Sequence, residues 1–398
     1  MIKAICFLVR TPLTKRDYDR FGVDLIRGRG LDVYVLDLTS LLNPQYLEKY
    51  TPNNLVNDQN IIIFKSRQDL ERALKEKGKT IFVVDFIGAD YSNLFIYRYF
   101  KKYGILYASF CANTLPLSRA PKEKSWPKKI MTKVTKVFST KFFRKAINYF
   151  LIRSFFYVCK ILQHIGYIKG PDYMLVGGGK IVSTYPLSTA ATSIIYGHTL
   201  DYDIILKEKI IPQDNSYAVF IDQYVPYHPD AIISNVDKID AEKYYKGLNR
   251  FFDWFEDKFK QEVVIAAHPR SNYDQKPQCF SNRKIIKGRT IEVIAGANYV
   301  ITHGSTAVTF AVCFNKPLVF LTCDMFERTY HGIHINASAN QFGKTPINVD
   351  RPYEKLDISL VSDESLYLDY FEKYIKTQGS PQKQFWEIVI DELQTIKK

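Results

Sequence analysis

The sequence predicts an α/β protein built from two parallel, doubly wound sheets. Short apolar segments alternate with amphipathic segments of helical period in both halves of the chain, as strands and crossover helices do in parallel sheets. The alternation breaks at residues 116–170 and then resumes. A chain of 398 residues with 46% apolar content can also bury two separate cores. We therefore expect two Rossmann-like halves that face a central ligand cleft.

The N-terminal half should form residues 1–210. Its first segment, 2–9, is interpreted as a strand and not as a signal peptide, because the apolar run is short and Arg10 and Pro12 follow it. The predicted elements after it are strands at 31–37, 61–66, 80–88 and 105–110, helices at 16–29, 67–77 and 91–103, and a resumed strand in YMLVGGGK at 173–180.

The C-terminal half, residues 211–375, repeats the alternation. We expect strands at 217–224, 263–267, 298–302 and 317–322 and helices at 238–260, 290–297 and 305–314. The tail from 364 to 397 is largely helical in pattern, so a separate C-terminal helix is predicted within 376–398.

The net charge of +14 comes mostly from one segment. Residues 124–171 hold eleven Lys or Arg and no Asp or Glu, which leaves 44 basic against 41 acidic residues, or +3, elsewhere. Nucleic-acid binding by the whole protein is therefore not implied. On a helical wheel Lys129, Lys133, Lys136 and Arg144 share one side, largely opposite apolar residues, and an aromatic-rich stretch follows.

That pattern is typical of a helix lying in the surface of an anionic membrane, and 116–170 is too interrupted for a confident transmembrane span. We expect a protein of the cytoplasm that associates with the inner face of the cell membrane. The alternatives are a helical insertion with solvated lysines, or contact with RNA, for which no binding signature is present.

The six cysteines show no CxxC pair and no regular framework, as expected for reduced residues of a cytosolic protein. No cluster of His, Cys and carboxylates has zinc-ligand spacing, so neither a metal nor another cofactor is predicted.

Chemistry-bearing residues follow the strand predicted at 263–267. His268-Pro269-Arg270 comes directly after it, and the histidine and the arginine can both donate to phosphate oxygens, while proline stiffens the turn. A histidine that donates to a leaving phosphate stabilises its developing charge and can act as a general acid. The structural alternatives are a histidine that only caps the loop and an arginine paired with a surface carboxylate.

A second such tract follows the strand predicted at 298–302. In His303-Gly304-Ser305-Thr306 the glycine permits close backbone approach, and the two hydroxyl residues open a helix whose first N–H groups are free to bind an anion. The tract can also be a plain helix N-cap, and His303 can be buried structure.

Two acidic residues are further candidates. Asp222 ends the strand that opens the second half and should face the cleft, where it could deprotonate an acceptor hydroxyl. The structural alternative is that Asp222 belongs to a loop that only fixes the interface between the domains. Glu327 follows the strand at 317–322 and could contact a ribose or sugar hydroxyl.

Three other signals are weak. Asp201-Tyr202-Asp203 fits the D-x-D pattern of metal-dependent sugar transfer, but Asp17-Tyr18-Asp19 fits it equally well. Gly177-Gly178-Gly179-Lys180 lacks the spacing of a P-loop and is interpreted as a turn beside the cleft.

Three of these tracts carry a family resemblance. His268-Pro269-Arg270, then His303 to Ala307, then NKPLVFLT at 315–322 resemble the C-terminal half of bacterial GT-B glycosyltransferases of the sialyltransferase type. HTLDYD at 198–203, FIDQYVPYHPD at 220–230 and AAHPRS at 266–271 also resemble capsule or O-antigen proteins that transfer nonulosonic acids, such as sialic, legionaminic or pseudaminic acid. The resemblance covers roughly 170–330, and the N-terminal half only in architecture.

The resemblance implies a GT-B fold and metal-independent transfer of a nonulosonic acid from a CMP donor to a surface saccharide or lipid-linked acceptor. The acceptor would lie on the N-terminal half, residues 1–210, and the nucleotide sugar would bind to the C-terminal half, residues 211–375. By position, His268, Ser305 and Thr306 would bind the CMP phosphate and Asp222 would be the base; the family's Gly after two acidic residues is absent here. With the wider interpretation of both loops, the nucleotide-binding set is His268, Arg270, His303, Gly304, Ser305, Thr306 and Glu327.

Three rival functions stay open. One is a nucleotide-sugar epimerase of the same two-domain build, which would need no membrane segment. Another is a polyol-phosphate transferase of teichoic-acid type, which would use a CDP-alcohol. The third is a non-catalytic glycan- or lipid-binding partner in a polysaccharide assembly complex.

Overall fold

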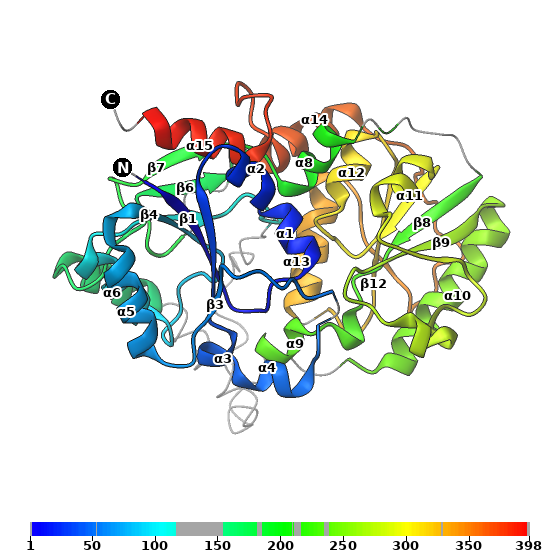
Figure 1. Cartoon of the computed structure of the whole chain (residues 1–398). Coiled ribbons are helices and arrows are strands. Elements are labelled where there is room, and N and C mark those ends of the chain that lie inside the picture. The colour runs from blue at the N-terminus through cyan, green and yellow to red at the C-terminus, as the bar shows by residue number, and fades with distance from the viewer. Residues whose placement is uncertain are drawn as a thin grey trace, which may run out of the picture.

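Two parallel sheets form the centre of the protein, one in each half of the chain (Figure 1). The computed structural model describes residues 2–52, 54–116, 154–180, 185–208, 210, 216–234, 239–327 and 329–395. The lysines and the arginine predicted to bind a membrane, Lys129, Lys133, Lys136 and Arg144, lie outside these residues.

The N-terminal sheet has seven strands in the order β3-β2-β1-β4-β5-β6-β7. They are β1 (Ala4–Val9), β2 (Asp32–Asp37), β3 (Ile61–Ile63), β4 (Ile81–Asp85), β5 (Leu106–Phe110), β6 (Tyr173–Val176) and β7 (Ser193–Tyr196). The helices of this half are α1 (Lys15–Arg20), α2 (Val23–Gly28), α3 (Thr39–Leu42), α4 (Pro44–Lys49), α5 (Arg67–Lys77), α6 (Leu94–Tyr103), a helix at 154–164, and α8 (Leu200–Lys207).

The C-terminal sheet has six strands in the order β10-β9-β8-β11-β12-β13. They are β8 (Tyr217–Ile221), β9 (Glu262–Ala267), β10 (Ile285–Lys287), β11 (Tyr299–Thr302), β12 (Leu318–Thr322) and β13 (Ile347–Asn348). The helices are α9 (Asp230–Ser234), α10 (Ala241–Phe259), α11 (Thr290–Gly296), α12 (Val308–Cys313), α13 (Tyr330–Gln341), α14 (Glu364–Tyr370) and α15 (Phe385–Thr395).

Both sheets have the same strand order at their centres and so the same kind of ligand position. In each, the order reverses between the first strand and the fourth, at β1 and β4 and at β8 and β11. Loops that leave the carboxyl ends on either side of such a reversal diverge and leave a crevice. The residues after β8, β9 and β11 are those that the sequence analysis selected.

The helix predicted over 16–29 is two helices, α1 and α2, separated at Gly22. Gly22 has a φ of 58°, which favours glycine, and a Cβ there would lie 2.5 Å from the ring of Trp386. The break therefore has two causes: a left-handed turn, and an aromatic ring that packs directly on the glycine.

Trp386 belongs to α15, which packs on the N-terminal half although it ends the chain. Its ring centroid is 4.9 Å from that of Phe7 in β1, and its Nε1 donates to the carbonyl of Arg20 over 2.8 Å. Phe385, Val389 and other residues of α15 join the core cluster on that side of the N-terminal sheet.

The segment that leads to α15 crosses from one half to the other over Gly177-Gly178-Gly179. A Cβ on Gly178 would collide with the carbonyl group of Lys373, and the Thr377 N–H donates to the Gly177 carbonyl over 3.2 Å. The glycines are therefore needed where two backbone segments cross closely, and not for binding a phosphate as in a P-loop.

Five strand ends share one turn. Asp37, Asp85, Asp222, Thr302 and Asn348 each stand at or just after the end of a strand, and a side-chain oxygen of each accepts the N–H two residues further on. Such turns satisfy backbone donors where the ladder ends. A polar residue at a strand end in this protein therefore has a structural task before any chemical one.

Two further features bear on the sequence analysis. All six cysteines are free thiols, four of them buried. Among the helices in the described part of the chain, none has the length and apolar content needed to cross a membrane.

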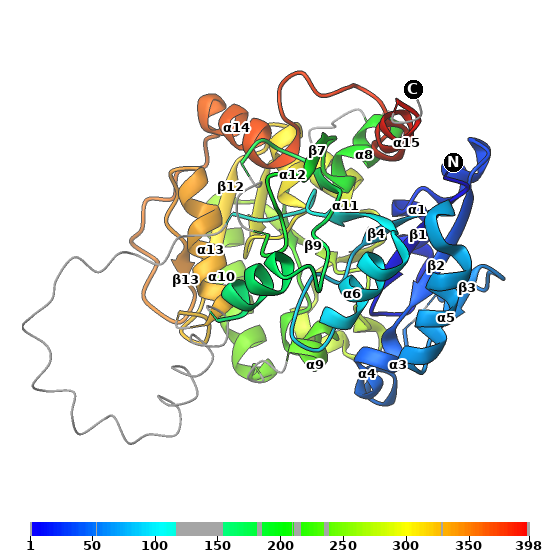
Figure 2. The same cartoon turned by 90° about the vertical axis from the view of Figure 1, so that its left-hand side faces the viewer.

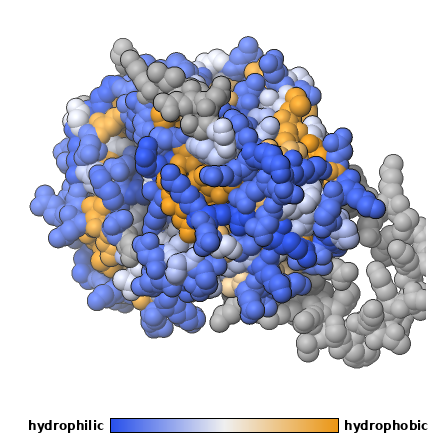
Figure 3. All heavy atoms as spheres, turned by 90° about the vertical axis from the view of Figure 1, so that its right-hand side faces the viewer, coloured by the Kyte–Doolittle hydropathy of each residue, from blue (hydrophilic) through white to orange (hydrophobic). Residues whose placement is uncertain are grey.

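On the C-terminal half, the face shown in Figure 3 is mostly hydrophilic, with hydrophobic residues in separate patches.

Candidate active site

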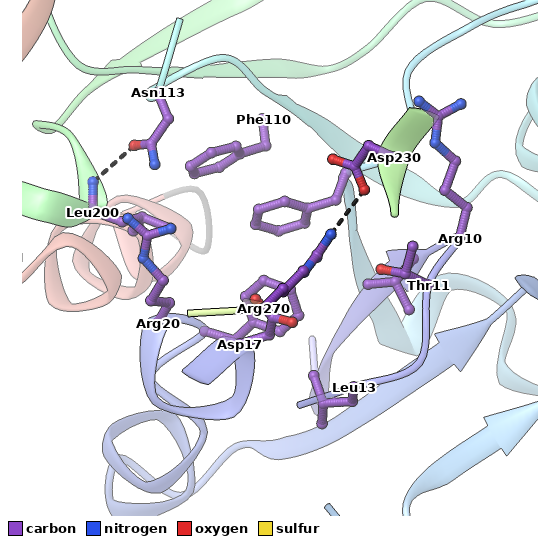
Figure 4. Close-up of a pocket in the computed structure, with 13 residues that line it drawn as sticks. Arg10, Thr11, Leu13, Asp17, Arg20, Phe110, Asn113, Leu200, Asp230 and Arg270 are labelled. Atoms are coloured by element: carbon purple, nitrogen blue, oxygen red, sulfur yellow. Dashed lines mark hydrogen bonds and ion pairs between the residues drawn. The ribbon is translucent and has the colours of Figure 1, made fainter. Parts of the chain in front are cut away.

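A cavity of about 350 Å³ lies at the carboxyl edge of the N-terminal sheet, where the two halves meet (Figure 4). Its wall is formed by Val9, Arg10, Thr11, Leu13, Asp17, Arg20, Phe21, Phe86, Phe110, Asn113, Leu200, Asp230 and Arg270. Only Asp230 and Arg270 in this set come from the C-terminal half. The cavity is thus a pocket of the N-terminal half that the other half closes.

Aromatic rings form one part of the cavity wall. The rings of Phe86 and Phe110 stack at 4.3 Å, and Phe21 lies 4.6 Å from Phe86. Their strands and helix hold them rigidly, because Phe86 follows β4, Phe110 ends β5, and Phe21 follows α1. An apolar wall with polar groups around it is the usual composition of a small-molecule site.

Arg270 reaches into this cavity from the loop after β9. Its guanidinium pairs with Asp230 over 2.7 Å (Figure 4). Asp230 keeps a side chain that is more than half exposed, so this is an ion pair open to a ligand and not a buried one. Burial lowers the pKa of Arg270, but the nearby Asp230, Tyr46 and Tyr50 outweigh that effect, so the pKa is raised overall.

His268 lies in the same loop and is a neutral imidazole. Its Nδ1 accepts the Arg270 N–H over 3.2 Å, so the proton is on Nε2. Burial, together with the nearby His228, Arg16 and Arg270, lowers the pKa of His268 to about 2. The ring of His228 is 4.7 Å away. At neutral pH His268 therefore offers one N–H donor and no positive charge.

Arg16 shows how close the two halves come at this point. Burial and the neighbouring Arg20 lower the pKa of Arg16 to about 10, and Arg270 contributes. Since Arg16 is in α1 and also lowers the pKa of His268, the start of α1 faces the loop after β9 across the cleft. Sequence reasoning could not place these cations together, because they belong to different sheets.

Asp222 is not where the sequence analysis expected it. The residue is 2% exposed, and its carboxylate accepts from the N–H groups of Tyr224 and His268 and from the Tyr273 hydroxyl, at 2.8, 3.2 and 2.9 Å. Burial raises the pKa of Asp222 to about 6. The carboxylate therefore ties the loops after β8 and β9 together, and it does not face the cleft in this conformation. Its role as general base stays a prediction.

His303 is also inside the C-terminal half. It is 3% exposed, its Nδ1 donates to the Leu321 carbonyl over 2.7 Å, and its Nε2 accepts from the Tyr244 hydroxyl at 3.0 Å. Burial lowers the pKa of His303 to about 4, which suits a neutral ring. Both ring nitrogens are used within the fold, as the interpretation of His303 as buried structure expects, and its contact with the nucleotide stays a prediction.

The tract after β11 makes a tight loop before its helix. Gly304 has a φ of 107°, and a Cβ there would lie 3.2 Å from the Ser338 hydroxyl. The Ser305 hydroxyl accepts from the Ala307 N–H at 3.2 Å, and α12 begins only at Val308, three residues after the predicted start at 305. Ser305 and Thr306 are half-buried in this loop, and their phosphate role is untested.

Glu327 lies in the loop after β12 and is exposed. Its carboxylate pairs with Arg351 over 2.5 Å and accepts from the Asn348 amide at 3.2 Å. Glu327 is not among the residues that line the cavity, and its contact with a sugar hydroxyl stays a prediction.

The weak D-x-D patterns have different outcomes. Asp201 pairs with Arg20, and Asp203 accepts the Phe385 N–H over 2.7 Å, so both hold α8 against neighbouring segments. Asp17 lines the cavity instead. Across the described ranges, no group of three or more His, Cys, Asp or Glu side chains could hold a metal ion.

The sequence analysis missed most of the residues around the cavity, among them Arg10, Thr11, Asp17 and Asn113. The signal for Arg10 and Thr11 was present, because they follow β1 directly as His268 follows β9. Asp17 and Asn113 follow loops of different length, so only the folded structure brings them to this edge.

Comparison with known proteins shows the fold. No protein-family model matches the chain, and no curated protein matches its sequence. Among solved structures, the wall teichoic acid polymerase TagF has a TM-score of 0.51 at 12% identity over 99% of this chain and 89% of its own. The S. aureus MnaA–UDP co-structure has a TM-score of 0.50 at 14% identity over 100% and 97%.

These likenesses define the class of fold. The chain has the GT-B α/β fold, with two Rossmann-like domains of seven and six parallel strands facing a cleft, which confirms the predicted fold class. At 12 and 14% identity, the two likenesses show the fold alone.

Proposed function

We propose that the protein is a glycosyltransferase that moves a sugar from a nucleotide-activated donor to a saccharide or lipid-linked acceptor. The observation that carries this proposal is the meeting of two different edges. Arg270, in the loop after β9, lines a cavity with an aromatic wall at the ends of β1, β4 and β5, and the neutral His268 lies two residues earlier in the same loop. One edge suits a phosphate and the other a sugar, so the geometry matches a transfer between two ligands.

The charge on the departing nucleotide would be stabilised by donors from the C-terminal half. The Nε2–H of His268 and the Arg270 guanidinium can both donate to a phosphate oxygen. Ser305 and Thr306 follow β11, which is separated from β9 by β8 alone, and their hydroxyls can donate as well. Because His268 is neutral, it would act first as a hydrogen-bond donor and would gain a proton only if bound phosphate raised its pKa. This chemistry needs no metal ion.

A base for the acceptor hydroxyl has two candidates. Asp222 is the one that the family resemblance implies, but three donors already occupy its carboxylate. Asp17 lines the cavity, and its only hydrogen bond from a side chain in the described residues is from the Thr14 hydroxyl at 2.7 Å. A base has to reach the proton that it removes. We therefore favour Asp17, with Asp222 as the residue that holds the two loops.

The donor is proposed to be a CMP-activated nonulosonic acid, on the resemblance of the tracts after β9 and β11 alone. Thermal-shift measurements with CMP, UDP, GDP and CDP-glycerol test this directly. Stabilisation by CMP supports the proposal. Stabilisation by UDP alone would favour the epimerase or a UDP-sugar transferase. Stabilisation by CDP-glycerol would favour the polyol-phosphate transferase of teichoic-acid type. The fold does not separate these rivals from the proposal, because MnaA and TagF have the same fold. No stabilisation by any nucleotide would favour a non-catalytic binding partner.

A membrane contact is the other part of this proposal, and an exposed apolar stripe supports it. Tyr157, Ile161 and Ile165 are spaced four residues apart along and just after the helix at 154–164 and are 63, 60 and 65% exposed. That helix lies on the outside of the molecule beside α6 (Figure 2).

The opposite face of the same helix is anchored to the protein. Phe155 and Cys159 are buried, and the Lys160 ammonium donates to the Ser188 carbonyl over 2.6 Å. A surface helix normally turns its polar residues outward, so an outward apolar stripe indicates a partner. The excess of Lys and Arg at 124–171 favours an anionic membrane as that partner, at the inner face of the cell membrane.

A further inference from the structure

The polar groups of the cavity that lack a partner are donors. Among the described residues, neither the Arg10 guanidinium nor the Thr11 hydroxyl has a hydrogen bond or ion pair. Asn113 uses its Oδ1 to accept the Leu200 N–H over 2.9 Å, which leaves its amide N–H groups for the cavity. Figure 4 shows this bond and the Arg270–Asp230 pair, and no interaction for Arg10.

The acidic groups of the cavity are already engaged. Asp230 pairs with Arg270, and Asp17 accepts from Thr14 with Arg16 at 4.0 Å. Arg20 pairs with Asp201 outside the cavity. Within the described part of the chain, Arg10 is the cation of the cavity wall that has no ion pair, and a guanidinium is shaped to bind a carboxylate or phosphate through two parallel hydrogen bonds.

The aromatic wall adds a second requirement. The stacked rings of Phe86 and Phe110 offer an apolar surface beside these donors. A flat apolar surface next to hydrogen-bond donors suits a sugar ring, which has apolar C–H faces and hydroxyl edges. The cavity of about 350 Å³ is within the range of small-ligand pockets.

We propose that this cavity binds a sugar that carries an acidic group, with the carboxylate or phosphate on Arg10, the ring against Phe86 and Phe110, and a hydroxyl on Asn113, which lies on the opposite side of the cavity from Arg10 (Figure 4). The inference rests on the proposed function and adds the class of sugar that the N-terminal half recognises. Because the wall is almost entirely N-terminal while the proposed phosphate-binding tracts are C-terminal, the acceptor's terminal sugar is the source that we expect. The donor's own sugar has the same chemistry.

In Figure 4 Arg10 and Asp17 lie on different sides of Arg270. An acidic sugar with its anion on Arg10 would therefore keep that charge away from Asp17 and turn a hydroxyl edge toward it. This placement removes the apparent conflict between an anionic ligand and a carboxylate base in the same cavity.

The test compares methyl β-D-glucuronide with methyl β-D-glucoside, which differ in the acidic group. We expect the glucuronide to bind the full chain at least tenfold more tightly by calorimetry or ligand-observed NMR. Arg10→Gln should bring the two affinities together. Asn113→Asp should also weaken glucuronide binding, because it keeps the acceptor for Leu200 and replaces a donor with a negative charge. Arg289→Gln, at an exposed arginine of the C-terminal half, is the matched control and should change nothing.

Equal affinity for the two glycosides, or a glucuronide affinity that survives both Arg10→Gln and Asn113→Asp, would overturn the inference. Nucleotide stabilisation is measured on the same samples, so the proposed function can stand while this inference falls. To identify the source, an activated acidic sugar such as CMP-N-acetylneuraminic acid is added. Simultaneous binding of the glucuronide assigns the cavity to the acceptor, and displacement assigns it to the donor's sugar.

Discussion

The carboxyl edges of the two sheets differ in how much of their polar chemistry is left for a ligand. At the C-terminal edge, Asp222 and His303 are buried and fully hydrogen-bonded within the protein. At the N-terminal edge, Arg10, Thr11 and Asn113 keep donors without partners in the described part of the chain. Polar residues at strand ends are therefore no guide to function until their hydrogen bonds are counted.

The strongest way to break this comparison is to neutralise one acid from each edge. Asp17→Asn should lower sugar transfer by about 10²–10⁴-fold, the usual effect of removing a general base, and leave the free energy of unfolding nearly unchanged. Asp222→Asn should instead lower stability by about 1–3 kcal/mol, because one oxygen that accepts hydrogen bonds becomes a donor. Steady-state kinetics and chemical denaturation on both variants measure the two effects.

Asp19→Asn is the matched control for Asp17, since Asp19 is exposed on the same helix and pairs with Lys15. Full activity in Asp17→Asn together with a well-folded, inactive Asp222→Asn would assign the base to Asp222 and reverse our preference.

Among the described residues, no partner is found for the Nε2–H of His268 at the C-terminal edge, and removing this donor should sharpen the contrast. His268→Ala should reduce kcat by about 10²–10³-fold, as loss of a donor to a developing negative charge does. The exposed His164→Ala is the control. A wild-type kcat in His268→Ala would contradict the proposed role of His268 as a donor to the departing phosphate.

The two halves also differ at their outer surfaces, and this difference predicts where a membrane is bound. Replacing Tyr157, Ile161 and Ile165 by serine should weaken binding to phosphatidylglycerol vesicles by about 100-fold, since each side chain would lose roughly 1 kcal/mol of partial burial. The control replaces Val361 and Leu368, which are 70 and 60% exposed on the C-terminal half. Vesicle co-sedimentation is the measurement.

Equal loss in both variants would mean general hydrophobic adsorption. Retained binding in the triple variant, combined with loss on Lys129, Lys133 and Lys136→Glu, would assign the contact to the basic segment alone.

The smallest effect that we expect concerns the buried histidine of the C-terminal edge. The pKa of His303 is lowered to about 4 in the folded protein, against 6.5 in the unfolded chain. The unfolded state therefore binds more protons below pH 6.5, and stability falls as the pH falls. From pH 7 to pH 5 this one residue should cost about 2 kcal/mol. His303→Gln should lose correspondingly less stability over the same interval in urea denaturation, and an unchanged pH slope would contradict its buried, neutral state.

Much of the fold could be predicted from the sequence because strand and helix periodicity is local. The strands at 2–9, 31–37 and 263–267 lie within a few residues of β1, β2 and β9. Of the two causes of the break at Gly22, the packing of the aromatic ring could not be predicted, since it comes from a tryptophan 364 positions later in the chain. The two-domain build was predictable, and the closing of the last helix on the first domain was not.

The candidate site divides in the same way. Sequence reasoning found the loop at His268 and Arg270, because a strand end followed by basic residues is visible locally. It could not see that Tyr273 and two backbone N–H groups occupy Asp222, or that Asp17 lines the cavity while Asp201 holds Arg20. Those outcomes depend on which side chains other segments bring, and a single sequence does not contain that information locally.

The position of α15 has a consequence for how this protein folds during its synthesis on the ribosome. The N-terminal half needs Phe385 and Trp386 to complete its core, and those residues are synthesised only after every strand of the C-terminal sheet. Its apolar surface under α15 must therefore stay uncovered while the C-terminal half is made, although chains generally fold from the N-terminus onward. Deletion of α15 should accordingly destabilise the N-terminal half, and a chaperone that shields apolar surface would bind the nascent chain there.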